Sequence, residues 1–198
     1  MKHALPRSFH TRSDVVRIAR ELLGKVLVTE FGERTSGIIT ETEAYAGITD
    51  RASHAFGGRH TARTEVMYAR GGTAYVYLCY GMHHLFNVVT HEEGTPHAVL
   101  IRAINPHEGL DAMSARRKGR PLRTDGPALV CQALGISIAH TGLDLVSGLI
   151  RIEDHGFKPG KDAVIIGPRI GVEYAGEDAR LPYRFRIAPS APQSWKRA

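Results

Sequence analysis

Apolar residues recur along this chain at two spacings, and the spacing changes where glycine or proline interrupts it. Residues 13–23 carry them every three or four positions, which predicts a helix. The apolar positions in that stretch are Val15, Val16, Ile18, Ala19, Leu22 and Leu23. Thr11 or Ser13 can cap the start of the helix, and Gly24 stands where a left-handed residue ends one.

Most of the remaining chain shows alternating or short apolar runs between Gly and Pro turns, which is typical of strands. Strands are predicted over residues 25–30, 37–45, 73–79, 85–90, 98–104, 149–153, 163–166 and 184–187. Two further helices are predicted over residues 108–117 and 127–134. Because strands and helices do not alternate regularly, a doubly wound parallel sheet is disfavoured. The pattern predicts an α+β fold, in which a mostly antiparallel, curved sheet has flanking helices.

The predicted strand 37–45 carries two acids. A period of two places Glu41, Glu43 and Tyr45 on one face of it. Two carboxylates on one face repel each other when both are ionised, so one of them can keep a raised pKa and act as a general base. From spacing alone, the commoner alternative is an exposed face on which both acids are hydrated.

A protruding β-hairpin is predicted from strands 73–79 and 85–90. Its turn holds Tyr80 and Met82, two large side chains that a hairpin tip gives little to pack against. Such a tip suits a wedge inserted between stacked bases. The strand tyrosines, such as Tyr77, have the plainer alternative of filling a core.

Length and charge narrow the class of protein. With 198 residues and 42% hydrophobic content, the chain can form one core, so we expect a single domain over residues 1–198, with a frayed tail from about residue 189. The net charge of +6 favours an anionic partner such as nucleic acid. The densest basic run, residues 116–123, is interpreted equally well as phosphate contacts or as a solvated helix end.

Other classes of protein and site are disfavoured. No apolar run is long enough for a membrane span, the start lacks a secretory signal, and two distant cysteines form no disulfide framework, so we expect a reduced, cytoplasmic setting. The histidines lack metal-ligand spacing, so no metal site is expected. Because no Walker loop, dinucleotide fingerprint or nucleophile elbow is present, no cofactor is expected either.

Several motifs then occur in order along nearly the whole chain. They are Glu41-Thr42-Glu43-Ala44-Tyr45, His54, Gly57-Gly58-Arg59-x-Thr61-x-Arg63, Tyr75-Val76-Tyr77, Tyr80-Gly81-Met82, Asn87, Leu100-Ile101-Arg102-Ala103, Gly126-Pro127, Cys131-Gln132-Ala133-Leu134 and Pro168-Arg169-Ile170-Gly171. Together they resemble the alkyladenine (methylpurine) DNA glycosylase family. So many ordered matches are more specific than any single motif.

The resemblance implies a monofunctional enzyme, without lyase activity, that removes alkylated or deaminated purines from double-stranded DNA and so begins base-excision repair. Such enzymes flip the nucleotide out because its sugar–base bond is inaccessible in the stack. By motif position, Glu43 would activate the attacking water. Tyr45 and Tyr77 would stack on the flipped base, with His54 on its other face or edge. Asn87 would crowd out purines that bear a 2-amino group.

The resemblance also assigns DNA contacts outside this pocket. Tyr80 would fill the gap in the duplex, Met82 would flank it, and Arg102 would help to place the backbone or the water. Where some relatives carry another aromatic residue after the methionine, this chain has His83. It also lacks the long N-terminal extension of some relatives, so partner binding through such a tail is not expected.

Two other functions compete with this one. A non-catalytic protein that binds damaged or single-stranded nucleic acid would need only stacking tyrosines and basic residues. A metal-dependent hydrolase would have to be built on the histidines. In the favoured case one small enzyme acts on one duplex, so a monomer is expected.

Overall fold

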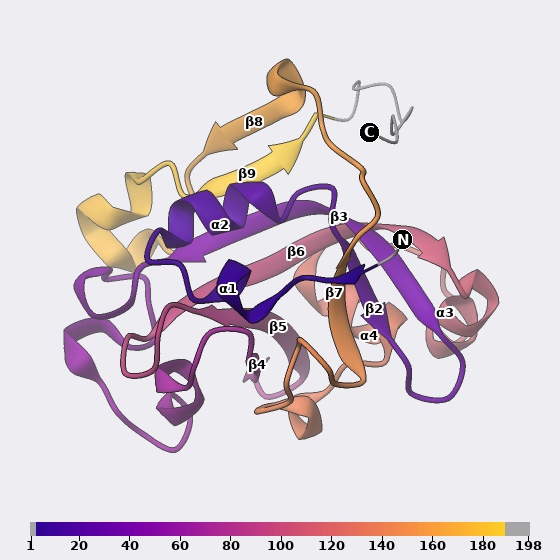
Figure 1. Cartoon of the computed structure of the whole chain (residues 1–198), viewed down its shortest axis with the longest axis horizontal. Coiled ribbons are helices and arrows are strands. Elements are labelled where there is room, and N and C mark those ends of the chain that lie inside the picture. Colours follow the sequence, from indigo (N-terminus) through magenta and orange to yellow (C-terminus); the bar gives the residue numbers. More distant parts are fainter. Residues whose placement is uncertain (1–2, 189–198) are drawn as a thin grey trace.

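Nine strands form one antiparallel sheet in the computed structural model, which describes residues 3–188 (Figure 1). The strands are β1 (His3–Ala4), β2 (Val26–Thr29), β3 (Thr35–Tyr45), β4 (Ala74–Cys79), β5 (His83–Thr90), β6 (His97–Glu108), β7 (Ile150–Asp154), β8 (Val164–Gly167) and β9 (Arg184–Ile187). The main path through the sheet runs β1-β7-β2-β3-β6-β5-β4, and β8 and β9 branch from it. This arrangement confirms the predicted α+β class.

Short helices accompany the sheet. The α-helices are α1 (Arg7–His10), α2 (Val15–Glu21), α3 (Leu110–Arg116) and α4 (Pro127–Leu134). The 3-10 helices are η1 (Gly47–Thr49), η2 (Phe56–Gly58), η3 (Glu65–Tyr68), η4 (Ile138–His140), η5 (Lys161–Ala163) and η6 (Glu173–Arg180). In Figure 1, α2 lies across β3, and the β8–β9 pair lies beyond it.

The central strand β3 has different neighbours along its length. It pairs with β6 over most of its residues, with β2 near its start and with β9 near its end. The register sets Glu43 opposite Leu100 of β6 and Arg184 of β9. The acidic half of β3 therefore lies between two strands.

The two faces of the sheet are covered differently. One face packs on α2 and α4, where Thr42 donates through Oγ1 to the carbonyl oxygen of Ala19 at 2.7 Å. On the other face a smaller core forms from Ala55, Met67, Tyr75, Val89 and Ala98. Side chains alternate between these cores because successive residues of a strand point to opposite faces.

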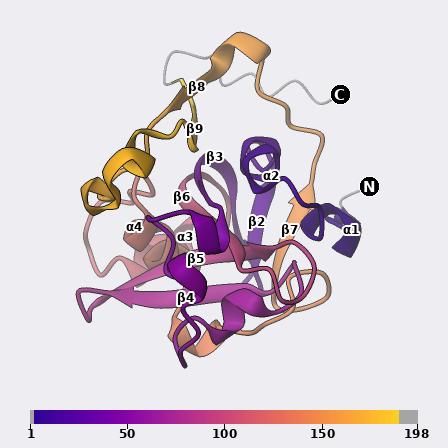
Figure 2. The same ribbon diagram turned by 90° about the vertical axis from the view of Figure 1, so that its left-hand side faces the viewer.

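The β4–β5 hairpin protrudes from the body of the molecule (Figure 2). Cys79 pairs with His83, so Tyr80, Gly81 and Met82 form its three-residue loop. Tyr80 adopts a left-handed φ of 51° and is 89% exposed, and Met82 is 68% exposed. The predicted hairpin is confirmed, although β5 begins two residues before its predicted start.

The helices differ from prediction mainly at their ends. Helix α2 is shorter than predicted and is capped by Asp14, whose side chain accepts from the amide of Arg17, so the prediction of Thr11 or Ser13 as cap is wrong. Gly24 is left-handed as predicted. Strand β6 continues to Glu108, and α3 begins only after the left-handed Gly109. Helix α4 has the predicted bounds.

Some short elements were not predicted, and one prediction concerns residues outside the described range. The pattern did not reveal β1, α1 or the 3-10 helices, because such short elements carry no full period. The predicted fraying from about residue 189 lies outside the described residues. Within residues 3–188, no helix has the length and apolar character needed to cross a membrane.

Candidate active site

A row of side chains crosses four strands on the face of the smaller core. Glu43 is paired with Leu100, Leu100 with Asn87, and Asn87 with Tyr75. Neighbouring strands lie about 4.8 Å apart, so the row spans roughly 14 Å. Sheet register therefore brings an acid, an amide and a phenol into one site from distant parts of the chain.

Glu43 lies at one end of this row and is fully buried. Its Oε1 accepts from the backbone amide of Ile170 at 2.9 Å, and its Oε2 accepts from the Tyr45 hydroxyl at 2.9 Å. The Nε of Arg102 lies 3.4 Å from Oε1. The alternative of an exposed face with hydrated acids is thus excluded for Glu43.

Burial raises the pKa of Glu43 above its ordinary value, although the charge of Arg102 and the hydrogen bonds from Ile170 and Tyr45 act in the opposite direction. The pKa of Tyr45 is also raised, by burial and by the neighbouring Glu43 charge, so its hydroxyl stays protonated and donates. The site thus holds a carboxylate of raised proton affinity, oriented by two donors.

Tyr45 is held in place from its ring face as well. The guanidinium carbon of Arg169 lies 4.8 Å from the centroid of the Tyr45 ring. Arg169 is buried, where Nη2 binds Oδ1 of Asp50 at 2.8 Å and Nη1 donates to the carbonyl oxygen of Ala44 at 2.9 Å. A buried ion pair, in which both amino groups of Arg169 donate, therefore holds the wall that Tyr45 forms.

A second wall is built from His54 and two tyrosines. The His54 ring meets the Tyr77 ring edge to face, with centroids 4.7 Å apart, and its Nδ1 lies 2.8 Å from the Tyr75 hydroxyl. Because Arg63 can only donate to Nε2, at 3.2 Å, Nδ1 carries the proton and donates to Tyr75. Burial and the charge of Arg63 lower the pKa of His54 to about 4, so this imidazole is neutral at pH 7.

These walls enclose a cavity of about 360 Å³. Of the residues predicted for the site, it is lined by Tyr45, His54, Tyr77, Tyr80, Asn87 and Arg102. Glu43 lies directly behind the lining, since its hydrogen-bond partners Tyr45 and Ile170 both belong to it. The structure thus brings seven of the eight predicted site residues together.

Met82 is the exception. It lines a separate hollow on the other side of the hairpin, beside His84 and α4. Within the cavity, Asn87 uses its amide nitrogen to donate to the carbonyl oxygen of Tyr75 at 3.1 Å. Within residues 3–188, no side chain or backbone amide donates to the Oδ1 of Asn87. This oxygen is therefore available as an acceptor in the cavity that Asn87 lines.

Sequence reasoning missed several residues of the site. It gave Glu41 no role, yet Glu41 accepts from Arg102 at 3.0 Å and from Arg184 at 2.6 Å. Arg169 and Ile170 belong to a motif that supported the family resemblance, and that motif was the signal that could have placed them in the site. No motif contains Arg184, which lies 143 residues after its partner Glu41.

The basic run 116–123 is partly structural. Arg116 donates to Thr35 and to the carbonyl oxygen of Ala133, and Arg117 is buried against Gln132. Lys118 and Arg120 remain exposed. Phosphate contact by the whole run is therefore incompatible with the fold, and only its exposed members remain available for it.

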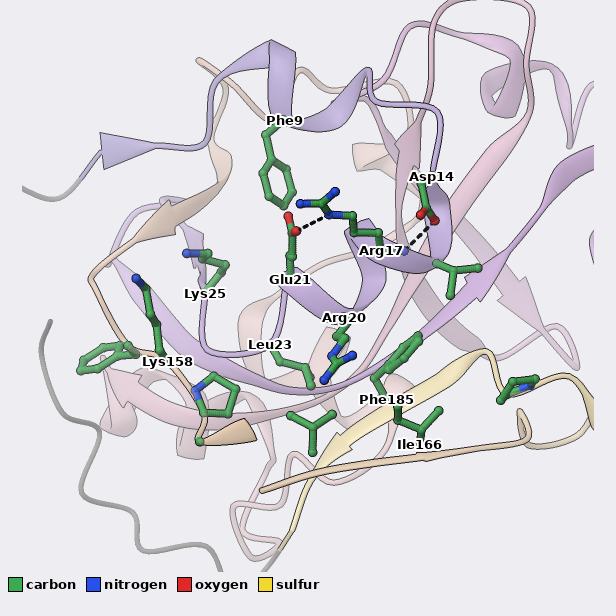
Figure 3. A pocket seen from close by; sticks show the side chains of 16 residues that line it. Phe9, Asp14, Arg17, Arg20, Glu21, Leu23, Lys25, Lys158, Ile166 and Phe185 are labelled. Atoms are coloured by element: carbon green, nitrogen blue, oxygen red, sulfur yellow. Dashed lines mark hydrogen bonds and ion pairs between the residues drawn. The ribbon is translucent and has the colours of Figure 1, made fainter. Parts of the chain in front are cut away.

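A larger cavity, of about 880 Å³, lies between α2 and the β8–β9 pair (Figure 3). Its lining is largely apolar, and both of its carboxylates are already engaged. Glu21 is bound by Arg12 and Arg17, and Asp14 caps α2. Because neither of these acids is buried as Glu43 is, the smaller cavity is the better candidate for chemistry.

Comparison with known proteins agrees with this geometry. A family model described as Methylpurine-DNA glycosylase (MPG) matches residues 8–191. The chain belongs to this family. It is therefore a DNA glycosylase, a hydrolase that acts on N-glycosyl bonds in DNA and serves DNA repair.

Individual relatives cover nearly the whole chain. A protein of Chlamydia abortus is 52% identical over 188 residues, which is 92% of this chain and 97% of the relative. Proteins of Myxococcus xanthus (48% identical; 94% of this chain and 91% of the relative) and Desulfitobacterium hafniense (42% identical; 94% and 96%) are similar as well. All three bear the name "Putative 3-methyladenine DNA glycosylase".

Proposed function

We propose that this chain is a monofunctional glycosylase that flips alkylated or deaminated purines out of double-stranded DNA and hydrolyses their N-glycosidic bond. The observation that carries the proposal is the buried carboxylate of Glu43, oriented by two donors directly behind an aromatic cavity. A binding protein would need the aromatic cavity but no buried, oriented acid.

The flipped base would lie between two walls of the cavity. Tyr77 and His54 touch each other, so they form one wall together, and Tyr45 forms the other. A planar base stacks well on such ring faces. Asn87 would press its side chain against the base edge and disfavour purines with a 2-amino group. Tyr80, exposed at the hairpin tip, would occupy the gap left in the duplex.

In the chemical step, the ionised Glu43 would accept a proton from water as its oxygen attacks the anomeric carbon, and its negative charge would stabilise the oxocarbenium-like sugar. The bond to the purine breaks as the new C–O bond forms. A cationic alkylated purine leaves readily, whereas a neutral base such as hypoxanthine needs a proton. Arg102 lines the cavity and would bind the backbone or the water.

The proposal includes no lyase step. A β-lyase needs an amine nucleophile to form a Schiff base with the sugar. The described lining of the cavity contains no lysine. Water activated by Glu43 is then the available nucleophile, and the product is an intact abasic strand.

The test is excision from duplexes that contain hypoxanthine or alkylated adenine, read as strand breaks after alkali. We expect breaks with alkali and none without it. Glu43→Gln should lower the excision rate by about 10²–10⁴-fold, the usual contribution of a general base, and keep lesion binding. Glu33→Gln, which changes an exposed carboxylate in the β2–β3 turn, should leave the rate unchanged.

Three outcomes would contradict parts of the proposal. If the native chain excised none of several such purines, the proposed substrate class would be wrong. If Glu43→Gln retained full activity, the role given to Glu43 would be wrong. Breaks that appear without alkali would show a lyase step.

A further inference from the structure

Glu41 makes a contact that the proposed reaction does not use. One oxygen of its carboxylate, Oε1, accepts from the Nε of Arg102 at 3.0 Å and from the Nε of Arg184 at 2.6 Å. All three side chains are largely buried, with 16%, 14% and 22% exposed respectively. Charge-assisted bonds in such a setting hold their partners firmly.

The fold brings these residues together from three strands. Arg102 lies on β6 and Arg184 on β9, on either side of β3. The pairing of β3 with β6 shifts register on both sides of Glu41. Such irregularities re-aim side chains next to active sites. Here the shift lies at the residue that binds both arginines.

The position of Arg102 relative to the two acids is informative. Its Nε lies 3.0 Å from Oε1 of Glu41 but 3.4 Å from Oε1 of Glu43. An arginine that closed on Glu43 instead would occupy an oxygen that the reaction needs, and would weaken that oxygen as a base. Glu41 competes for the same guanidinium and keeps it at the longer distance.

We propose that Glu41 is a positioning residue for the general base: it anchors Arg102 and Arg184 through one oxygen, so that neither guanidinium pairs fully with Glu43. This inference rests on the proposed function of Glu43. It adds that the neighbouring acid is required for a working base, and that the amino groups of Arg102 stay directed toward the cavity it lines.

The charges around Glu43 decide the direction of the test. On its own strand lie Glu41 and Tyr45; Arg102 faces it from β6, Arg184 from β9, Tyr77 from β4, and Arg169 from the segment before η6. The charge of Glu41 raises the pKa of Glu43, and that of Arg102 lowers it. Neutralising Glu41 therefore lowers the pKa of Glu43.

The experiment is the pH dependence of single-turnover excision of hypoxanthine by the full chain. Excision requires ionised Glu43, so its rate falls as pH drops through the pKa of that carboxyl. Glu41→Gln should move this acid limb to lower pH, because the variant lacks the charge that raises the pKa of Glu43. The plateau rate should fall about tenfold, because a weaker base transfers the proton less readily.

A matched control exists directly after β2, at Glu30. Glu30 Oε1 likewise accepts from two arginines, Arg34 and Arg151, both at 2.7 Å, far from the cavity. Glu30→Gln should change neither the acid limb nor the plateau rate. Melting temperatures of both variants show whether each one folds.

Defined outcomes overturn the inference. If Glu41→Gln kept the native rate and the native acid limb, the inference would be wrong. A slower rate with an unchanged acid limb would also contradict it, because a structural defect alone lowers the rate without shifting the limb. If that variant fails to fold, Glu41→Asp keeps the charge on a shorter arm; it should keep the limb and lose rate, and a native rate would refute the anchor. Absence of excision by the native chain would overturn the proposed function itself.

Discussion

At the residue scale, the site depends on one carboxylate kept where carboxylates are least stable. Glu43 is buried, and burial raises its pKa. When folding raises the pKa of a carboxyl group, its ionised form is less favourable in the folded chain than in the unfolded chain. Keeping the group ionised at pH 7 therefore lowers the free energy of unfolding. Under the proposed mechanism, activity and stability therefore make opposite demands on this position.

The same argument predicts that Glu43→Gln is more stable than the native chain at pH 7. Glutamine can accept from the Ile170 amide and donate to the Tyr45 oxygen, so both contacts survive without the charge. A gain of about 1 kcal/mol corresponds to roughly 2–4 °C in melting temperature for a domain of this size. Differential scanning calorimetry tests this; a lower melting temperature would show that the ionised form is net stabilising.

At the element scale, the β4–β5 hairpin presents its tip to solvent instead of to a core. Tyr80 is 89% exposed and holds a left-handed φ of 51°, a conformation that favours glycine. Neither packing nor backbone preference accounts for a tyrosine there. The proposed wedge would account for it, because a large ring can fill the space of a flipped nucleotide.

Tyr80→Gly should separate this function from folding. Stability should change by less than about 0.5 kcal/mol, because the side chain contacts little and glycine suits the backbone. Affinity for lesion duplex should fall about 10- to 100-fold, the value of one lost stacking contact. Leu149→Ala, which removes a half-exposed apolar side chain elsewhere on the surface, is the control and should bind normally. Native affinity in Tyr80→Gly would exclude the wedge.

At the scale of the whole molecule, the fold buries neutral histidines. His10 is fully buried, its two ring nitrogens have no hydrogen-bond partner among the described residues, and burial lowers its pKa to about 4. The pKa of His54 is also lowered to about 4, chiefly by burial. Both bind protons more weakly in the folded chain than in the unfolded one, whose histidines titrate near 6.5.

This difference predicts acid sensitivity with a defined window. Below about pH 6.5 the unfolded chain takes up protons that the folded chain refuses, so stability falls steadily as pH decreases toward 4. His10→Phe should reduce that fall, because it removes one of the groups with a strongly lowered pKa, while excision at neutral pH persists. Melting temperatures measured across the window test this; an equal fall in native chain and variant would contradict it.

Prediction from the sequence succeeded where the interaction is local. Alternation along residues 37–45 set Glu41, Glu43 and Tyr45 on one face, and the bounds of α4 followed from Gly126-Pro127 and Gly135. The fold class followed from the absence of β-α-β alternation. Each of these depends on neighbours within a few residues, and local preference together with side-chain period is sufficient for them.

Tertiary structure alone decided how the acids are used. The partners of Glu41 and Glu43 lie 61, 127 and 143 residues away, at Arg102, Ile170 and Arg184, and they meet only because strand pairing sets the register. Burial of Glu43, and the direction of its pKa shift, likewise depend on what the whole chain packs around it. The sequence determined that an acid faces a tyrosine; packing determined which acid is buried and which one holds the arginines.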